Sequence, residues 1–207
     1  MQNNNNNAPL ILFQPFNLVV FLSFYSPIIL AICLISMSFI FQNFKGFIYL
    51  GFLLACCVLR NYWYMMTGSK SIENDNTICT SIQYSKYGNP TFSAFVFAFT
   101  IVYISVPMFV NGAINFWILS GLLSFFAFDI FIKVYKGCVK NTVDLILNIL
   151  FGMVSSGLIV TFMYNGGSKQ HLFFNEVSSN KAVCSRPKEQ TFKCSLYKNG
   201  ELISSVN

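Results

Sequence analysis

The sequence predicts an all-α integral membrane protein, a bundle of about five transmembrane helices followed by a small C-terminal β-hairpin. Three observations predict this class. The chain of 207 residues is 55% hydrophobic and only 10% charged, whereas a soluble domain carries about 25% charged residues. Its apolar residues lie in long blocks of about 20, the length that crosses a bilayer as a helix. The segments between the blocks are polar and rich in turn-forming residues, so they lie outside the hydrocarbon.

Five apolar blocks define a helical bundle over residues 17–164. The expected spans are about 17–41, 46–66, 91–110, 114–132 and 142–164. Pro27 is acceptable in the first span, because neighbouring membrane helices can satisfy the carbonyl that proline leaves free. Three residues, Asn111 to Ala113, separate the third and fourth spans, which predicts a tight antiparallel pair. Small residues at Ser120–Gly121 and Ser155–Gly157 suit close helix packing.

The two ends of the chain are polar. Residues 1–16 are asparagine-rich with no sign of a cleaved signal peptide, so we expect a disordered N-terminus. Residues 165–207 form a polar tail, in which Asn199-Gly200 lies between two alternating segments. Asn-Gly in that setting is the strongest short hairpin signal. Because an isolated hairpin is only marginally stable in water, this one is expected to dock on the bundle or on a partner.

Charge gives a first estimate of orientation. Five crossings place the N-terminus and the loops 67–90 and 133–141 on one side and the tail on the other. The two-loop side carries five lysines near helix ends, Lys70, Lys86, Lys133, Lys136 and Lys140. The opposite side carries three, Lys45, Lys169 and Lys181, so the positive-inside rule favours a cytoplasmic two-loop side. The net charge of +6 suits lipid headgroups, and no motif for nucleic acid is present.

Seven cysteines are present, without the spacing of a metal site,. Neither a metal nor a cofactor is therefore expected. Three of them lie inside apolar spans, where a cysteine behaves as a small hydrophobic residue. Cys184 and Cys194 are the only pair on one polar segment, which makes them the disulfide candidate if the tail faces an oxidising compartment.

Polar residues inside the spans are the first candidates for function, because they are costly in a membrane. They are Arg60, Asp129, Asp144 and Asn148. Arg60 and Asp144 lie on the two-loop side and are placed to form an ion pair. The structural alternative is that Arg60 reaches the headgroups and Asp144 stabilises the start of its helix. The single histidine, His171, lies in the tail on the opposite side and is expected to be solvated.

Two stretches carry a family resemblance. Gly88-Asn89-Pro90-Thr91-Phe92-Ser93-Ala94 opens an apolar helix, and Ile132-Lys133-Val134-Tyr135-Lys136-Gly137-Cys138-Val139 precedes the last one. Together they resemble the type 2 phosphatidic acid phosphatases, the PAP2 family, over about residues 46–164. That family has Gly-x-Pro-Ser-Gly-His-Ala in the first stretch and Ser-Arg-Val-Tyr-Leu-Gly-Val-His in the second. It also places Arg-Pro near the end of an earlier helix, where Arg60 stands for the arginine and Asn61 replaces the proline.

The resemblance implies a membrane site for a phosphoryl group, with substitutions that remove its chemistry. The degenerate site positions are Arg60, Pro90, Thr91, Ser93, Lys133 and Asp144. Both family histidines are absent, because Ser93 and Val139 stand in their places, and the family mechanism needs a histidine nucleophile and a general acid. No catalytic residue is therefore assigned. Arg60, Lys133, Lys136 and Lys140 remain candidates for phosphate or headgroup binding.

Two functions follow from the resemblance. The preferred one is a non-catalytic, PAP2-like multi-pass protein with a structural or membrane-anchoring role. The alternative is a divergent lipid phosphate phosphatase acting on substrates like phosphatidic acid. A channel or transporter is less favoured, because the spans hold few polar groups. The tail, CSRPKEQTFKCSLYKNGELI, resembles the ends of PAP2-like proteins of large DNA viruses with an internal membrane. This implies a virion or host membrane component whose partners are lipids and, through the tail, capsid or membrane proteins.

Overall fold

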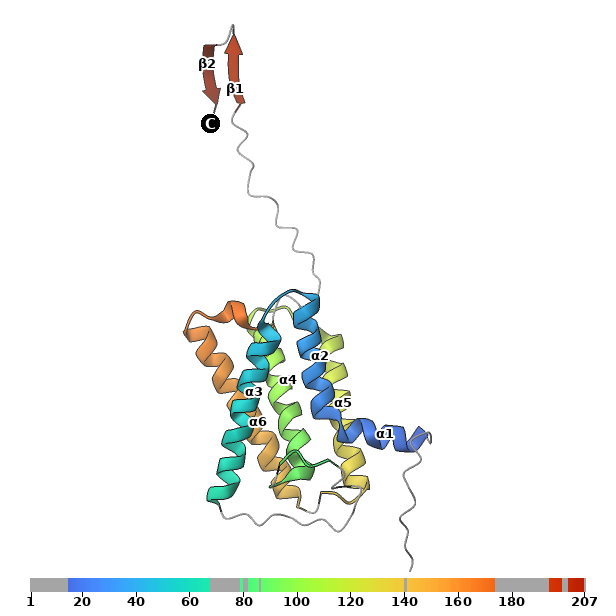
Figure 1. Ribbon diagram of the computed structural model, residues 1–207. Coiled ribbons are helices and arrows are strands. Elements are labelled where there is room, and N and C mark those ends of the chain that lie inside the picture. Colours follow the sequence, from blue (N-terminus) through green and yellow to red (C-terminus); the bar gives the residue numbers. More distant parts are fainter. Residues whose placement is uncertain are drawn as a thin grey trace, which may run out of the picture.

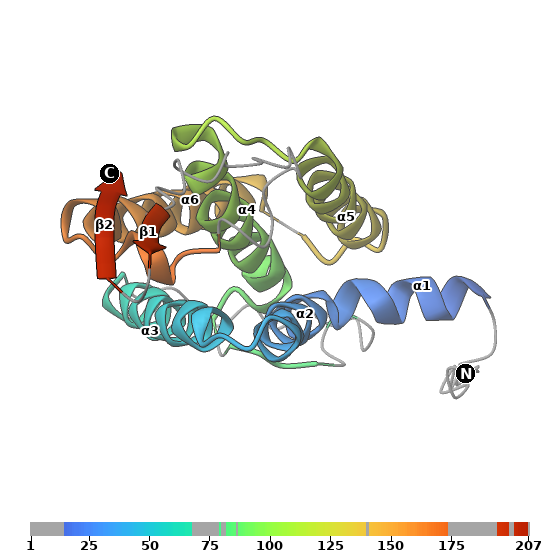
Figure 2. The same ribbon diagram turned by 90° about the horizontal axis from the view of Figure 1, so that it is seen from above.

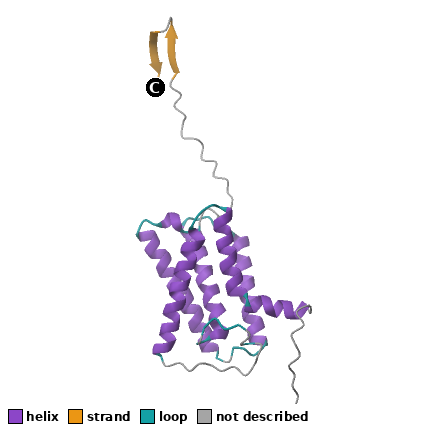
Figure 3. Cartoon of the chain, viewed as in Figure 1, coloured by secondary structure: helices purple, strands orange, loops and turns teal. Residues whose placement is uncertain are grey.

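The protein is an all-helical bundle. The computed structural model describes residues 15–67, 79, 82–85, 87–139, 141–173, 194–198 and 201–206, with the backbone alone for 15–17 and for the last two ranges. The elements are α1 (Pro15–Phe24), α2 (Ser26–Ile40), α3 (Lys45–Met66), η1 (Asn89–Thr91), α4 (Phe92–Val110), α5 (Phe116–Tyr135), α6 (Thr142–Asn165), η2 (Lys169–His171), β1 (Cys194–Lys198) and β2 (Glu201–Val206). Figure 3 shows how far the helices dominate.

Helix α4 is the centre of the bundle. Viewed along the axis in Figure 2, α2, α3, α5 and α6 surround it. In its apolar stretch 72% of the residues are buried, against 28% in α3, 17% in α5 and 22% in α6. A helix that is hydrophobic on every side is stable only when it is enclosed in this way. The outer helices therefore expose apolar faces.

Within the described part of the chain, four helices are long and apolar enough to cross a membrane, and a bent pair, α1 and α2, provides a fifth span if it counts as one. Helices α2, α4 and α6 run one way and α3 and α5 the other (Figure 1). We call the end where α3 and α5 finish and α4 and α6 begin the loop end. The opposite end, where α6 finishes, is the tail end. Helices α3 to α6 begin and end within three residues of the predicted spans.

The first predicted span, 17–41, differs from the structure. It is divided at Tyr25 into two helices inclined at 70°. Helix α1 therefore lies roughly perpendicular to the long helices and extends to one side of the bundle (Figure 1). Pro27 is one cause, because it has no N–H to continue the hydrogen-bond ladder of α1,. Asp129 is the other, because its Oδ1 accepts hydrogen bonds from Ser23 and from Ser26, both at 3.0 Å. The bend thus depends on a residue in α5 that lies about a hundred positions away in the sequence.

Two glycines allow helices to approach closely. A Cβ added at Gly152 would lie 2.5 Å from the carbonyl oxygen of Phe95, and one at Gly46 would lie 2.5 Å from that of Leu34. By contrast, a Cβ at Gly121 or Gly157 would meet nothing within 4 Å. The tight contact between α4 and α6 therefore lies at Gly152, three to five residues before the small residues expected from sequence, Ser155–Gly157.

The two strands pair antiparallel, with Cys194 opposite Val206 and Lys198 opposite Glu201. Asn199 and Gly200, the expected turn, fall outside the described residues. The docking of this hairpin on the bundle or on a partner stays a prediction.

Candidate functional site

The stretches singled out in the sequence meet at the loop end of the bundle. Helix α3 finishes there with Arg60 in its last two turns, and η1 leads there into α4. The turn between α5 and α6 completes this end (Figure 1). Two separate groups of polar side chains are buried there, one around Arg60 and one around Asp129.

Arg60 is the largest buried side chain, with 2% of its surface exposed. Its Nε donates to Oδ1 of Asn148 at 2.5 Å, and Nη2 donates to the carbonyl oxygen of Gly88 at 3.0 Å. Nη1 donates to the carbonyl oxygen of Tyr87 at 3.4 Å. A guanidinium has more N–H donors than these three bonds use. Arg60 thus keeps hydrogen-bonding capacity after its neighbours are satisfied.

The charge of Arg60 is balanced by aromatic rings and dipoles. Its guanidinium carbon lies 4.9 Å from the ring centre of Tyr64, 5.4 Å from that of Phe92 and 5.9 Å from that of Phe95, within reach of a cation–π attraction. Among the described residues no carboxylate lies within 4 Å of it, so the expected ion pair with Asp144 is not formed. Because Arg60 is buried, its side chain does not extend to the bundle surface as the structural alternative supposed, and a ligand reaches it only through the groove that it lines. Asp144 lines the same groove and attracts Arg60 only from a longer distance, and a buried cation without a directly paired anion is costly to maintain.

Asn148 and Gly88 fix the position of Arg60. The Asn148 amide nitrogen donates to the Tyr64 hydroxyl at 2.7 Å, to Thr91 Oγ1 at 3.0 Å and to the Asp144 carbonyl oxygen at 2.6 Å. Gly88 has φ +57°, and a Cβ there would lie 2.9 Å from Arg60 Nη2. The left-handed backbone favours glycine at this position, and a larger residue would displace the guanidinium of Arg60.

A groove of ≈ 430 Å³ opens beside Arg60 between α3 and α6. Polar residues line one part of it: Arg60, Tyr64, Thr67, Asp144 and Asn148. Apolar residues line the rest: Trp63, Leu147, Leu150, Phe151 and Val154. The size is that of a small-molecule site. A cation at one end and hydrocarbon along the other suit a ligand with an anionic head and an apolar chain.

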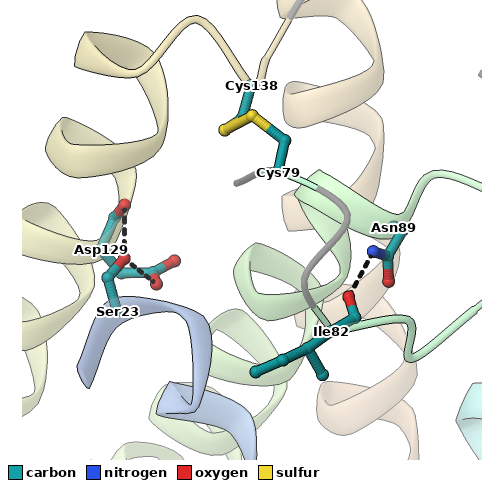
Figure 4. Close-up of a disulfide and its surroundings, with 6 residues drawn as sticks. All are labelled: Ser23, Cys79, Ile82, Asn89, Asp129 and Cys138. Atoms are coloured by element: carbon teal, nitrogen blue, oxygen red, sulfur yellow. Dashed lines mark hydrogen bonds between the residues drawn. A yellow bond between two sulfur atoms is a disulfide. The ribbon is translucent and has the colours of Figure 1, made fainter. Parts of the chain in front are cut away.

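The second polar group surrounds Asp129, whose side chain is fully buried. Lys133 forms an ion pair with its Oδ1 at 3.1 Å and also donates to its Oδ2 and to Ser93. The Ser93 hydroxyl donates to Asp129 Oδ2 at 2.5 Å, and Ser23 and Ser26 complete the group (Figure 4 shows Ser23 and Asp129). Every charge in this group has its partner. Ser93 and Lys133, expected beside Arg60, therefore bind Asp129 instead.

The remaining positions named by the resemblance enclose very little space. Pro90, Thr91, Val139 and Asp144 line a cavity of ≈ 10 Å³, which is room for about one water molecule. The Thr91 hydroxyl donates to the carbonyl oxygen of Gly88 at 3.1 Å. A phosphoryl group does not fit this cavity. The candidate anion site is consequently the larger groove, which Arg60 lines.

The segment before η1 is held by local bonds. The Asn89 amide donates to the carbonyl oxygen of Ile82 at 2.7 Å and accepts from the backbone N–H of Tyr84 at 2.8 Å (Figure 4 shows Ile82 and Asn89). The Tyr84 hydroxyl donates to the carbonyl oxygen of Phe24 at 2.8 Å. Burial raises the pKa of this hydroxyl to about 12, so it stays a donor at neutral pH. Asn89 and Tyr84 thus join the turn to α1.

A disulfide between Cys79 and Cys138 joins the segment after α3 to the turn after α5 (Figure 4). The sequence reading missed it, because the two cysteines lie 59 residues apart on different loops. The available signal was that the five-span topology puts both loops on one side. The expected pair lies elsewhere: Cys184 is outside the described residues and Cys194 is described by its backbone alone, so that disulfide stays a prediction.

Three other expected positions are accounted for. Lys136 caps the end of α5 and is partly exposed, and Lys140 lies outside the described residues. His171 is exposed in η2, after α6. From Asn148, the partner of Arg60, helix α6 continues to Asn165, which separates His171 from the Arg60 group by about 26 Å of helix. Tyr64, Ser23 and Ser26 were not singled out in the sequence, because nothing local marks a tyrosine or serine as a partner of a buried charge.

Comparison with known proteins adds no identification: no family model, no curated protein and no solved structure matches the chain. The fold and the site themselves define an all-helical bundle with membrane-length apolar helices and a buried arginine at the edge of an amphipathic groove.

Proposed function

We propose that this chain is a multi-pass membrane protein of PAP2-like design that binds the anionic headgroup of a lipid without hydrolysing it, and that it serves as a structural or anchoring component of its membrane. One observation carries the proposal. Arg60 is a buried cation with no carboxylate within 4 Å among the described residues, and it lines a groove whose other part is apolar. An anionic lipid supplies both the missing charge and the chain that such a groove accommodates.

The surface of the bundle supports a membrane location. The outer helices expose apolar side chains along their length. Three charged side chains within the helices, those of Arg60, Asp129 and Lys133, are buried, as expected in hydrocarbon. Trp63, near the loop end, is 62% exposed, and Trp117, at the tail end, is 89% exposed. Tryptophans at both ends of a helical bundle are typical of the two membrane interfaces. Location in a membrane is therefore the simplest explanation of this surface.

Arg60 is the best-placed of the expected headgroup-binding residues. A guanidinium binds phosphate oxygens through paired N–H donors, which makes arginine the preferred residue for this task. Lys133 is already neutralised by Asp129 inside the bundle. Asp144, which lines the same groove, disfavours highly charged ligands through its own carboxylate. A phosphate monoester or diester on a lipid is the chemistry that fits best.

The surroundings of the degenerate positions support binding without turnover. In the PAP2 family a histidine attacks the phosphorus and a second histidine protonates the leaving group. Val139 and Ser93 stand at those positions here, and Ser93 is bonded to Asp129. The neighbouring cavity of ≈ 10 Å³ has no room for a phosphoryl group. Enzymatic activity would therefore need a different nucleophile in the Arg60 groove.

The anchoring role rests on the tail as well as on the bundle. The chain resembles membrane proteins of large DNA viruses in its tail, and a β-hairpin in that tail suits contact with a capsid or with another membrane protein. Chemical cross-linking of purified particles tests this part, with a chain truncated after residue 173 as the control. The proposal expects cross-links from the tail to a neighbouring protein, and their absence in particles that contain the full chain would remove it.

Binding and turnover can be measured on one sample. The chain has two tryptophans, and Trp63 lines the groove, so a Trp117→Phe background lets fluorescence report on the groove alone. Titration with phosphatidic acid in nanodiscs is expected to change the Trp63 emission, with no release of inorganic phosphate. Arg60→Gln should abolish the change, while Arg60→Lys should keep part of it. Phosphate release that is sensitive to Asp144→Asn would instead establish the phosphatase alternative.

A further inference from the structure

The disulfide carries information about compartments. Cys79 and Cys138, joined in Figure 4, lie on the two loops at the loop end. Helix α3 also finishes at this end, with Arg60 in its last two turns. Structural disulfides form and persist in oxidising compartments, whereas cytosolic proteins keep their cysteines reduced. We infer that the loop end, with the Arg60 groove, faces an oxidising compartment, and that the tail faces the reducing cytosol. The inference rests on the membrane-spanning part of the proposed function and not on lipid binding.

Formation of the bond needs an oxidant, which the compartment supplies. The thiols of Cys79 and Cys138 lose two protons and two electrons, and one sulfur–sulfur bond forms. The electrons pass by thiol–disulfide exchange to a disulfide donor, which becomes a dithiol. Such donors are abundant in the secretory lumen and are scarce in the cytosol. Access of the two loops to that donor is what fixes the orientation.

Helix α6 places the pair Cys79 and Cys138 on one side of the membrane and the pair Cys184 and Cys194 on the other. Only the pair on the oxidising side is expected to form a disulfide. The helix begins at Thr142, four residues after Cys138, and its 24 residues suffice to cross a bilayer,. At its far end Leu172 and Phe173 are buried in the main core, so the chain leaves the bundle at the tail end. Cys184 and Cys194 follow from there. If Cys79 and Cys138 face the oxidising side, the tail cysteines face the reducing side and remain thiols.

This orientation is the reverse of the one that the number of lysines on each side favours. The structure weakens that argument, because one of the lysines counted on the two-loop side is buried. Lys133 is buried and paired with Asp129, so it does not act as a free charge at the membrane surface. The tail holds further basic residues beyond the three that were counted on its side: Arg186, Lys188, Lys193 and Lys198. The positive-inside rule weights residues close to the span ends, and with Lys133 excluded the two sides are nearly balanced. The disulfide then decides the orientation.

A pair of glycosylation acceptors tests the orientation directly. Ile78→Thr completes an Asn-x-Thr acceptor at Asn76 in the loop after α3, and Ala182→Thr completes one at Asn180 in the tail,. Each full-length variant is expressed in cells with a secretory pathway, and glycosidase-sensitive mass is measured. We expect glycan on the Ile78→Thr variant and none on the Ala182→Thr variant. Glycan on the tail variant would overturn the inference.

A thiol count covers the case in which neither acceptor is modified. The membrane fraction is denatured without reductant and treated with a maleimide carrying a large polymer. Of the seven cysteines we expect five to react in the wild type, all seven after reduction, and all six in Cys79→Ser and in Cys138→Ser without reductant. Seven reactive thiols without reductant would overturn the inference. Loss of the protein from carbonate-washed membranes would instead refute the membrane proposal, which keeps the two failures distinct.

Discussion

The contact between α4 and α6 gives the sharpest test of the packing. Gly152→Ala and Gly157→Ala make the same change in one helix, and alanine is favoured over glycine there by about 1 kcal/mol. At Gly157 the new methyl group meets nothing within 4 Å, so the variant should gain most of that amount. At Gly152 it lies 2.5 Å from the Phe95 carbonyl oxygen and 3.1 Å from Ala98 Cβ. A backbone oxygen cannot rotate away, so the two helices must separate.

Overpacking of this kind costs about 1–3 kcal/mol. Because the propensity gain is common to both variants, the difference between them isolates the clash, and we expect it to be about 2 kcal/mol. For a chain of this size that corresponds to roughly 4–8 °C in melting temperature. Thermal unfolding in detergent can be followed by the reaction of the buried Cys56 thiol with a maleimide dye. Equal melting temperatures for the two variants would refute the close approach of α4 and α6 at Gly152.

Three further predictions concern the polar groups. Asp129→Asn leaves Lys133 buried without its counterion and should lower the free energy of unfolding by about 3–5 kcal/mol. Adding Lys133→Met should recover much of the loss in the same thermal assay. If it does not, the broken ion pair is not the cause of the loss. Gly88→Ala and Gly112→Ala both place a side chain at positive φ, which costs about 1–2 kcal/mol of stability in each variant. Only the methyl group at position 88 meets Arg60. In the fluorescence titration, only Gly88→Ala should therefore abolish headgroup binding. Asp144→Asn removes a negative charge from the groove and should strengthen binding of an anionic lipid by on the order of 1 kcal/mol, which lowers Kd roughly fivefold. Weaker binding by this variant would contradict the placement of the ligand in the groove.

The lengths and positions of the helices were predictable from the sequence, because an apolar block of about 20 residues determines both. The bend in the first span was not. Pro27 alone is compatible with a continuous membrane helix. The 70° angle is held by hydrogen bonds from Ser23 and Ser26 to Asp129, a contact between residues more than a hundred positions apart. No local pattern in either segment encodes it.

The residues of the site were largely predictable, but their partners were not. Arg60, Asp129, Asp144 and Asn148 stood out because polar groups are rare in apolar helices. Which of them would pair depended on the direction in which each side chain leaves its helix. Arg60 binds the Asn148 amide rather than the carboxylate of Asp144. A one-dimensional sequence does not give the relative rotation of two helices, and the same limit hid the disulfide between two distant loops.

The central claim is that the Arg60 groove holds an anionic lipid and leaves it intact. Native mass spectrometry of the protein, purified in mild detergent with added phosphatidic acid, measures this most directly. The account predicts a bound species at the mass of intact phosphatidic acid in the wild type, its loss in Arg60→Gln and its retention in Gly157→Ala. Equal occupancy in wild type and Arg60→Gln, or conversion of the bound lipid to diacylglycerol by the wild type alone, would contradict it.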